Sequence, residues 1–600
     1  MRHYVYRKPD NLVELFETAV ELFCHNRLFG VKSSDKKTLN WMTYKQVGDR
    51  ADNLRAGLAT LGIGWGDAVG IIANNSPDWA ITSFASYGRA ARFVPMYEAE
   101  LVKIWQYIIA DAEVKVLFVS KPAVYDKVKD FPKQIKTLQK IILIEGKGPG
   151  TMKELEEIGS MKPIPSVLPG PYDIAVLIYT SGTTGDPKGV LLSHGNLTHC
   201  AKSGFHIYPD LDQNACSLSI LPWAHSYGQT AELYNWFQFG GSIGFMESVD
   251  TLIQDLALVQ PTFLIAVPRV FNRIYNGLWT RMREEGGMKL KLFETAVETA
   301  KKKRVLTEQG VSDPVVNAKL AVLDKLVFAK IRERFGGRLK GALTASATMN
   351  PEIAHFFFDV GIPVYDCYGL TETSPAVTMN CPASYRLGSV GQTVERVKVV
   401  IDKSVVEPEA QDGEIIVYGP NVMQGYHNKP DDTKAVMTDD GGFRTGDRGK
   451  FDKDGFLFIT GRIKEQYKLE NGKYVFPAAI EEDIKLIPSV ANALIYGEGK
   501  PYNVCLVYPD FAFLAGYARE HNLSDTPKEM ASDIHIREYL INEINAALKG
   551  RYGGYEIPKK FIFLTEDFTL ENGMLTQTMK VKRNVVVDRY RGDLEALYKG

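Results

Sequence analysis

The residues whose types point most clearly to chemistry lie together in Tyr179–Gly189, a segment with the sequence YTSGTTGDPKG. Its glycines let backbone N–H groups turn toward an anion, its Ser and Thr hydroxyls add donors, and Lys188 adds a mobile positive charge. These properties suit a polyphosphate. The segment is not a Walker P-loop, because Lys188 is followed by Gly189 instead of Ser or Thr. A flexible polar loop is the alternative, and the length of the motif argues against it.

Four shorter motifs follow along the chain: Tyr368–Thr373 (YGLTET), Thr445–Asp447 (TGD), Gly461–Lys464 (GRIK) and Met579–Arg583 (MKVKR). Each has an ordinary explanation when taken alone. A Thr-Glu pair often starts a surface helix, a TGD sequence often forms a turn, and a basic stretch is usually solvated. Together and in this order, the five motifs resemble those of the AMP-forming adenylating enzymes, which include acyl-CoA synthetases, peptide-synthetase adenylation domains and luciferases.

The resemblance covers nearly the whole chain and implies a reaction in two steps. Three further segments, Val267–Phe271, Gly461–Pro477 and Pro501–Asn503, are most similar to long-chain fatty acyl-CoA synthetases. In such enzymes a carboxylate attacks the α-phosphate of ATP to give an acyl adenylate and pyrophosphate, and the thiol of CoA then displaces AMP. Because two anions must meet in the first step, positioning and positive charge are the main catalytic needs.

The resemblance also implies roles for individual residues. Tyr368 would lie against adenine, Asp447 would accept hydrogen bonds from both ribose hydroxyls, and Arg462 would add a donor near the ribose and phosphates. Thr371 would donate to the α-phosphate or the acyl carboxylate. Glu372 would bind Mg²⁺, a hard cation that takes oxygen ligands. The residues expected to hold the β- and γ-phosphates are Thr180, Ser181, Gly182, Thr183, Thr184, Gly185 and Lys188.

Two lysines are expected to serve different half-reactions. Lys580 would bridge the carboxylate and the α-phosphate in the first, although Met579 stands where the family usually has glycine. Lys468 and Gly472 would line the path of the CoA thiol in the second, with an ordinary turn as the alternative for Gly472. Because one pocket cannot easily receive both groups at once, the resemblance implies rotation about a hinge at Lys464.

The acyl group is expected near a second set of residues. His225, within Leu221–Gly228 (LPWAHSYG), matches an aromatic–His motif beside the family's acyl site, and a core histidine is the alternative. Trp223 would gate or line an acyl tunnel, or simply pack. The segment Thr344–Met349 (TASATM) replaces a Gly-rich turn of the family, so its extra Cβ atoms would narrow the pocket or change its backbone.

The elements that must position these residues alternate along the chain. Short apolar runs predict buried strands, and helical patterns between them predict an α/β fold with largely parallel sheets. Residues 281–340 predict a helical insertion, within which we expect Lys301–Arg304 to be a solvated face or loop, with a lipid or protein contact as the alternative. The expected domains are a large layered α/β unit, 1–463, and a small mobile α+β unit, 464–600, with the site between them. The expected strands are Ala68–Ala73, Val114–Val119, Ile141–Ile144, Ile174–Tyr179 and Phe456–Thr460.

Composition narrows the class of protein. The 600 residues are 45% hydrophobic and 24% charged, as in ordinary globular proteins. A formal net charge of −1 provides no global field for nucleic acid. The six cysteines form no C-x-x-C pair, which predicts reduced thiols and a cytoplasmic location. We expect neither a signal peptide nor a spanning helix, and peripheral membrane contact stays open.

The sequence therefore predicts an enzyme that uses ATP, Mg²⁺ and CoA to activate a carboxylic acid, with a medium- or long-chain fatty acid as the expected substrate. Two alternatives remain within the family: a ligase that hands the acyl group to a carrier protein, and a CoA ligase for an alicyclic or aromatic acid. A non-catalytic ATP-sensing protein and a luciferase-like oxygenase are less favoured. Joint retention of Lys188, Glu372, Asp447 and Lys580 argues against the former, and the Gly461–Pro477 loop favours CoA over oxygen chemistry.

Overall fold

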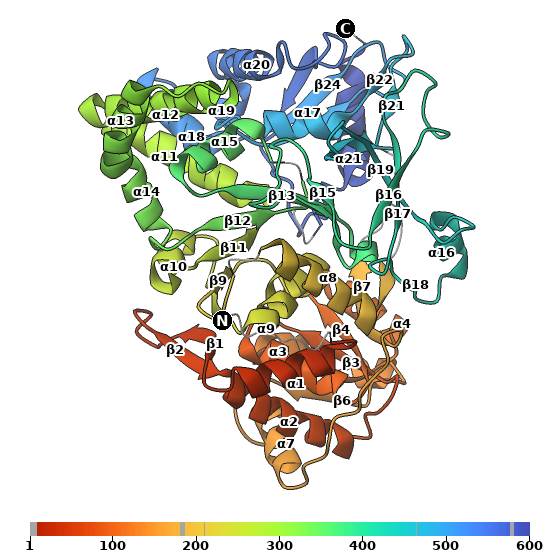
Figure 1. The fold of residues 1–600 in the computed structure, drawn as a ribbon. Coiled ribbons are helices and arrows are strands. Elements are labelled where there is room, and N and C mark those ends of the chain that lie inside the picture. Colours follow the sequence, from red (N-terminus) through yellow and green to blue (C-terminus); the bar gives the residue numbers. More distant parts are fainter. Residues whose placement is uncertain are drawn as a thin grey trace.

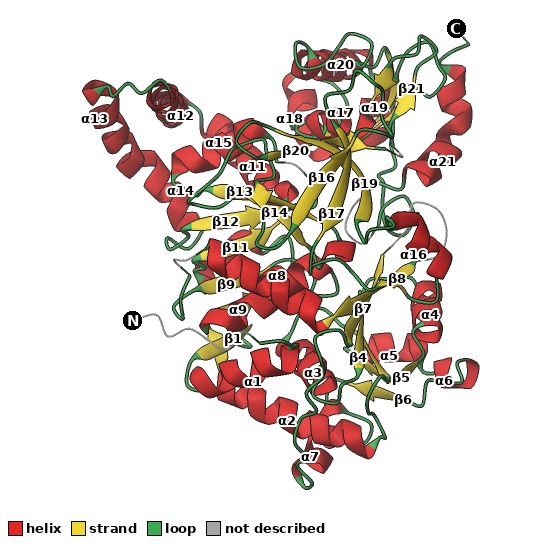
Figure 2. Ribbon diagram, turned by 45° about the vertical axis from the view of Figure 1, so that its right-hand side comes forward, coloured by secondary structure: helices red, strands yellow, loops and turns green. Residues whose placement is uncertain are grey.

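The computed structural model describes residues 9–180, 187–208, 211–347, 349–463, 465–576 and 581–599. Residues 9–160 lie in the lower part of Figure 1, and the residues after 464 lie at the top, against a central sheet. Figure 2 shows the same layers after a 45° turn.

The lowest layer is a seven-stranded sheet with the strand order β18-β8-β7-β4-β3-β5-β6. Strands β7, β4, β3, β5 and β6 run parallel, and β8 and β18 join antiparallel at one edge. In sheet order, the strands are β18 (Gly425–Tyr426), β8 (Lys188–Ser193), β7 (Ile174–Thr180), β4 (Arg92–Met96), β3 (Ala68–Ile72), β5 (Val114–Val119) and β6 (Lys140–Leu143).

Both faces of this sheet are covered by helices. Along β3, Val69 and Ile71 pack into one hydrophobic cluster while Ala68 and Ile72 pack into another, as the alternation of a strand requires. The near-continuous apolar sequence of these strands is typical of a parallel sheet buried on both sides. The helices of this region are α1 (Leu12–Leu22), α2 (Tyr44–Thr60), α3 (Pro77–Tyr87), α4 (Val102–Asp111), α5 (Pro122–Val128), α6 (Phe131–Gln134), α7 (Met152–Ser160) and α8 (His194–Ile207).

A second, five-stranded sheet is parallel from β11 to β13 and antiparallel beyond. Its strands are β11 (Phe263–Ala266), β12 (Gly341–Thr344), β13 (Val364–Gly369), β14 (Ala376–Met379) and β15 (Gln392–Thr393). The predicted helical insertion joins β11 to β12, but it begins earlier than residue 281. It consists of α11 (Pro268–Glu285), α12 (Gly287–Glu308), α13 (Pro314–Leu323), a π-helix (Asp324–Phe328) and α14 (Ala329–Arg334), and α15 (Pro351–Val360) precedes β13.

Two four-stranded sheets complete the part before residue 464. One has the order β2-β1-β10-β9, and the other, β16-β17-β19-β20, is wholly antiparallel. Their strands are β1 (Arg27–Lys32), β2 (Leu39–Thr43), β9 (Cys216–Ser219), β10 (Ser242–Phe245), β16 (Lys398–Asp402), β17 (Gly413–Tyr418), β19 (Phe443–Phe451) and β20 (Leu457–Arg462). The remaining helices are the π-helix η1 (Gly228–Tyr234), α9 (Asn235–Phe239), α10 (Leu252–Val259), the short 3₁₀-helix η3 (Thr371–Thr373) and α16 (Pro430–Val436).

The residues after 464 build their own cores. Two hydrophobic clusters contain only buried residues from 467 onward, one centred on α17 and α20 and one on α21. The elements are β21 (Tyr467–Lys468), β22 (Tyr474–Val475), α17 (Pro477–Ile484), β23 (Val490–Tyr496), β24 (Val504–Pro509), α18 (Phe511–Glu520), α19 (Pro527–Ser532), α20 (Ile534–Leu548), β25 (Lys560–Phe563) and α21 (Arg583–Ala596). The predicted α/β class with a smaller α+β part is thus confirmed.

All six cysteines are free thiols in the structure, in line with the expectation of reduced residues. None of the helices in the described ranges is long and apolar enough to cross a membrane.

Candidate active site

A large cavity of about 2330 Å³ opens between the sheets of the long N-terminal part and the residues after 464. Single small-molecule sites usually measure about 300–1,000 Å³, so this one has room for more than one ligand. Of the described residues to which the sequence analysis assigns a catalytic or binding role, eight line it: Thr180, Lys188, His225, Tyr368, Thr371, Glu372, Asp447 and Arg462.

Asp447 is the centre of one group on the cavity wall. It is buried on β19, and Arg462 lies directly opposite on β20. Arg462 Nε donates to Asp447 Oδ1 at 2.7 Å, and the Tyr368 hydroxyl donates to Oδ2 at 2.7 Å. The Asp447 carboxylate raises the pKa of Arg462, and burial raises the pKa of Tyr368 well above its usual value. Each carboxylate oxygen keeps a further lone pair, so Asp447 can also accept from two neighbouring hydroxyls.

Thr371 and Glu372 lie in η3, which follows β13. Thr371 Oγ1 lies 3.2 Å from Ser226 Oγ, within hydrogen-bonding distance. The Tyr426 hydroxyl donates to Glu372 Oε1 at 2.9 Å. Tyr426 lies on β18. Its pKa is raised mainly by burial and, to a smaller extent, by the nearby charge of Glu372.

The Glu372 site can be tested for its fit to Mg²⁺. The described ranges contain no cluster of three or more His, Cys, Asp or Glu side chains suited to a metal ion. Glu372 therefore offers one carboxylate, of which one oxygen already accepts from Tyr426. Magnesium commonly binds to one or two protein carboxylates together with substrate phosphates and water, so this single ligand fits an ion that arrives with a nucleotide.

Thr180 and Lys188 face each other across β7 and β8, where the glycine-rich segment begins and ends. Lys188 Nζ lies 3.0 Å from Asp432 Oδ1 and 5.1 Å from the centroid of the Tyr426 ring. This ammonium group can exchange Asp432 for a phosphate, since both partners are anionic oxygens. Ser181, Gly182, Thr183, Thr184 and Gly185 lie outside the described residues.

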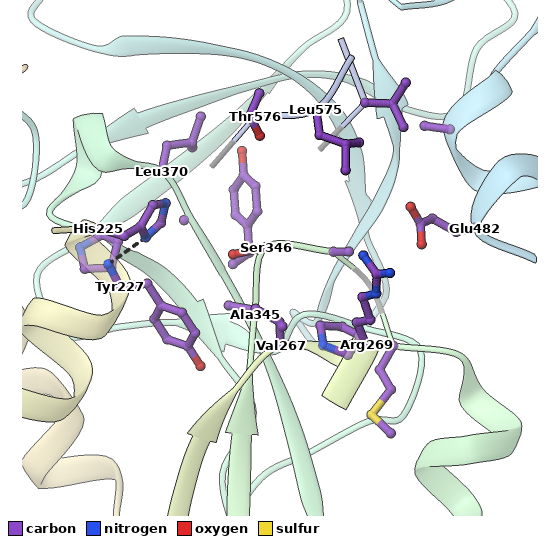
Figure 3. Close-up of a pocket in the computed structure, with 18 of the residues that line it drawn as sticks. His225, Tyr227, Val267, Arg269, Ala345, Ser346, Leu370, Glu482, Leu575 and Thr576 are labelled. Atoms are coloured by element: carbon purple, nitrogen blue, oxygen red, sulfur yellow. Dashed lines mark hydrogen bonds between the residues drawn. The ribbon is translucent and has the colours of Figure 1, made fainter. Parts of the chain in front are cut away.

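His225 and Trp223, although two residues apart, have different surroundings. His225 lines the cavity, and its Nδ1 accepts from the backbone N–H of Tyr227 at 3.2 Å (Figure 3). Trp223 is fully buried and packs against Trp79, while its Nε1 donates to Glu232 at 2.9 Å. The structure therefore gives Trp223 the packing role that the sequence left open, not a place on the cavity wall.

The unusual turn after β12 does shape the cavity. Ala345, Ser346, Ala347 and Met349 all line it, and Figure 3 shows Ala345 and Ser346 beside Val267. Ser346 has φ 76°, in the left-handed region that glycine adopts most readily. The turn thus keeps a glycine-like backbone while placing side chains on the wall.

Lys468 and Gly472 are not among the residues that line the cavity. Lys468 is exposed on β21, with Nζ 4.6 Å from the Tyr474 ring centroid, and Gly472 has φ 79° in an open turn. In contrast, Val581 of the MKVKR segment forms an isolated β-bridge with Leu575, and both residues line the cavity. Figure 3 shows Leu575 and Thr576 at its upper edge. Lys580 and Lys464 lie outside the described residues.

The sequence analysis did not identify two residues of the site, Ser226 and Tyr426. Ser226 stands next to His225 in a motif that was already singled out, so its contact with Thr371 had a local signal. Tyr426 had none, because it reaches Glu372 only through the pairing of β18 with β8.

Comparison with known proteins agrees with this geometry. Residues 16–427 match the family model of the AMP-binding enzymes, and residues 464–600 match that of the AMP-binding enzyme C-terminal domain. The long-chain-fatty-acid–CoA ligase FadD15 of Mycobacterium bovis is 34% identical over 567 residues, covering 92% of this chain and 91% of the relative. Fatty acyl-CoA synthetase A of Dictyostelium discoideum is 30% identical over 583 residues, covering 93% of this chain and 86% of the relative.

Solved structures share the fold at lower identity. The adenylation domain of the carboxylate reductase from Mycobacterium chelonae gives a TM-score of 0.79 at 21% identity, covering 98% of this chain and 91% of that one. An anthranilate CoA ligase in complex with anthranoyl-AMP gives a TM-score of 0.73 at 17% identity, covering 97% of each chain.

Proposed function

Because the chain belongs to the family of AMP-binding enzymes, we propose that it activates a fatty acid with ATP to an acyl adenylate and transfers the acyl group to CoA, releasing AMP and pyrophosphate. The observation that carries the proposal is the convergence of Asp447, Thr371, Glu372 and Lys188 on one cavity. The 34% identity to a ligase named for long-chain fatty acids supports the substrate class.

In the first half-reaction, this chain's residues would hold two anions together. Asp447 accepts from the ribose hydroxyls while Tyr368 and Arg462 fix its carboxylate. Thr371 donates to an oxygen of the α-phosphate or of the acid, from a position that Ser226 helps to define. Lys188, the first residue of β8, neutralises phosphate charge. Magnesium, bound at Glu372 with the nucleotide, would supply further shielding of phosphate charge.

Lys580 is proposed to complete this arrangement. Leu575 and Val581, which stand on either side of it in the sequence, line the cavity. Residues of the first turn of α21 line it as well. Arg583 makes a bidentate ion pair with Glu481 at 2.6 and 2.7 Å and donates to the Ile495 carbonyl at 2.7 Å. A lysine in this segment can cancel the repulsion between carboxylate and α-phosphate as the new P–O bond forms and pyrophosphate leaves.

In the second half-reaction, the thiol of CoA attacks the acyl carbonyl, a C–S bond forms, and AMP leaves with the electron pair of the broken C–O bond. Lys468 and Gly472 are proposed to line the thiol's path after the small domain, residues 464–600, rotates about Lys464. Neither residue lines the cavity in the present arrangement, which supports a role for them in a step separate from the first half-reaction.

The test is a panel of acids from acetate to palmitate, with benzoate, in the presence of ATP, Mg²⁺ and CoA. Formation of AMP and acyl-CoA should rise in step, and most strongly with long chains. Pyrophosphate without thioester would indicate a carrier-protein ligase instead. Preference for benzoate would favour an aromatic acid, and no product with any acid would reject the proposal.

We also propose peripheral contact with an anionic membrane surface through α13 and the π-helix that follows. Their outer side exposes Val315, Val322 and Leu326 at 75%, 58% and 47%, and Lys319 and Lys325 stand among them. Helices α12 and α13 project from the edge of the molecule in Figures 1 and 2. Sedimentation with phosphatidylserine vesicles should exceed that with neutral vesicles, and the V315S/V322S double variant should lose the difference. Equal sedimentation with both would contradict this contact.

A further inference from the structure

One arm of the cavity is not used by the chemistry described above. Its wall is a continuous helical segment that runs through η1 and α9 and contributes Tyr227, Thr230, Ala231 and Asn235. The other lining residues come from α8, from Tyr208 directly after it and from β11, and they are mostly apolar: Cys200, Gly204, Tyr208, Phe263 and Ile265. The arm therefore combines an apolar lining with polar side chains at a few fixed positions, as specific ligand sites do.

Among the described residues of this wall, three buried polar atoms have no hydrogen-bond partner in the protein: Tyr227 Oη, Thr230 Oγ1 and Asn235 Oδ1. Thr230 and Asn235 are only 2% and 6% exposed. Leaving a buried polar atom unpaired costs about 1–3 kcal/mol, so such atoms normally have a partner in the functional state.

The backbone packed against Asn235 leaves space for its side-chain amide at the cavity wall. A Cβ atom added at Gly204 would lie 3.1 Å from Asn235 Nδ2 and 3.6 Å from Oδ1. Glycine at 204 thus leaves the room that the amide occupies between α8 and α9. An amide can donate and accept, and the Thr230 hydroxyl can do both as well. Together they suit a ligand oxygen that is a hydroxyl or a carbonyl.

Thr230 and Asn235 are placed to contact the middle of a bound acyl chain. Ser226, beside Thr371, begins the helical segment that carries Thr230 and Asn235. At about 1.5 Å per residue, the nine residues from Ser226 to Asn235 span roughly 13 Å of an α-helix, and somewhat less where the helix is wider. An acid with its carboxylate at Thr371 would reach Asn235 part-way along its chain.

We propose that the preferred substrate is a fatty acid that carries a hydroxyl or keto oxygen part-way along its chain, and that Thr230 and Asn235 bind this oxygen. The proposal rests on the proposed acyl-CoA synthetase function. It goes beyond it by naming the substituent and the two residues that determine specificity.

The experiment compares kcat/KM for hexadecanoate with that for hexadecanoates hydroxylated or oxidised to a ketone at each of carbons 6 to 12. At least one substituted acid should be preferred by about tenfold or more, because a site built to bond an oxygen discriminates against the analogue that lacks it. The variants Thr230→Val and Asn235→Leu should lose this preference and use hexadecanoate at least as well as the native protein does.

Both variants should fold, since each removes a polar atom that has no partner in the protein. Thr82→Val, a buried threonine in α3 outside the cavity, is the matched control and should keep the native preference. If the native protein uses hexadecanoate as well as every substituted acid, or if the preference survives both variants, the inference is wrong. Failure of all acids to give AMP and acyl-CoA would instead reject the proposed function, and this inference with it.

Discussion

Glu232 offers a quantitative prediction about the scaffold behind the site. Its side chain is buried in η1, where its carboxylate accepts from Ser217 Oγ at 2.8 Å, Ser219 Oγ at 2.6 Å and Trp223 Nε1 at 2.9 Å. Burial raises the pKa of Glu232 to about 7. Through Trp223, this carboxyl group anchors the loop that carries His225.

The raised pKa of Glu232 makes the free energy of unfolding depend on pH. A rise from 4.5 to about 7 corresponds to roughly 3 kcal/mol, at about 1.4 kcal/mol per tenfold change in acidity. Below pH 4.5 the folded and unfolded states both hold the proton, and the contribution is fully present. It is lost as the pH rises through 7, because the unfolded state releases its proton first.

The perturbation is Glu232→Gln, which keeps the shape of the side chain but cannot ionise. Unfolding free energies are measured for both proteins from pH 5 to pH 8. Relative to the variant, the native protein should lose about 2–3 kcal/mol over this interval. Glu294→Gln, at an exposed position on α12, is the control and should change with pH as the native protein does. Parallel curves for the native protein and Glu232→Gln would refute the reasoning.

Three further predictions concern the reaction. Asp447→Asn should raise the KM for ATP roughly tenfold with little change in the KM for the acid, because it weakens one hydrogen-bonding carboxylate at the ribose; an unchanged KM for ATP would speak against a ribose contact. Glu372→Gln should raise the Mg²⁺ concentration needed for half-maximal activity by about tenfold, and an unaltered Mg²⁺ titration would count against this residue as the ligand. Lys580→Ala should slow adenylate formation about a hundredfold or more while sparing thioester formation from preformed acyl adenylate; equal losses in both half-reactions would disprove the division of roles.

The sequence predicted the α/β scaffold well because its signals are local. The apolar runs at Val114–Val119 and Ile174–Tyr179 match β5 and β7 to within a residue. The family resemblance was confirmed for the same reason, since each motif is a short continuous segment. Lys188 begins β8, Tyr368 lies near the end of β13 and Asp447 lies in the middle of β19, and all three line one cavity.

The contacts that complete the site could not be predicted from a single sequence. Glu372 and Tyr426 are 54 positions apart, and Thr371 and Ser226 are 145 apart, so only the packed fold brings each pair together. The helical insertion was expected from residue 281, but α11 already begins at Pro268, where a proline at the first turn starts the helix. Lys468 does not line the cavity, and this depends on how the residues after 464 pack against the preceding sheets, which no local pattern encodes.

The most direct test of the central claim follows oxygen atoms through the reaction. A fatty acid labelled with ¹⁸O in both carboxylate oxygens is incubated with the protein, ATP, Mg²⁺ and CoA, and the AMP is analysed by mass spectrometry. Activation through an acyl adenylate predicts one ¹⁸O atom in each AMP, because the carboxylate oxygen that attacks the α-phosphate stays with it when the thiol displaces AMP. Unlabelled AMP, or ADP in its place, would contradict the account.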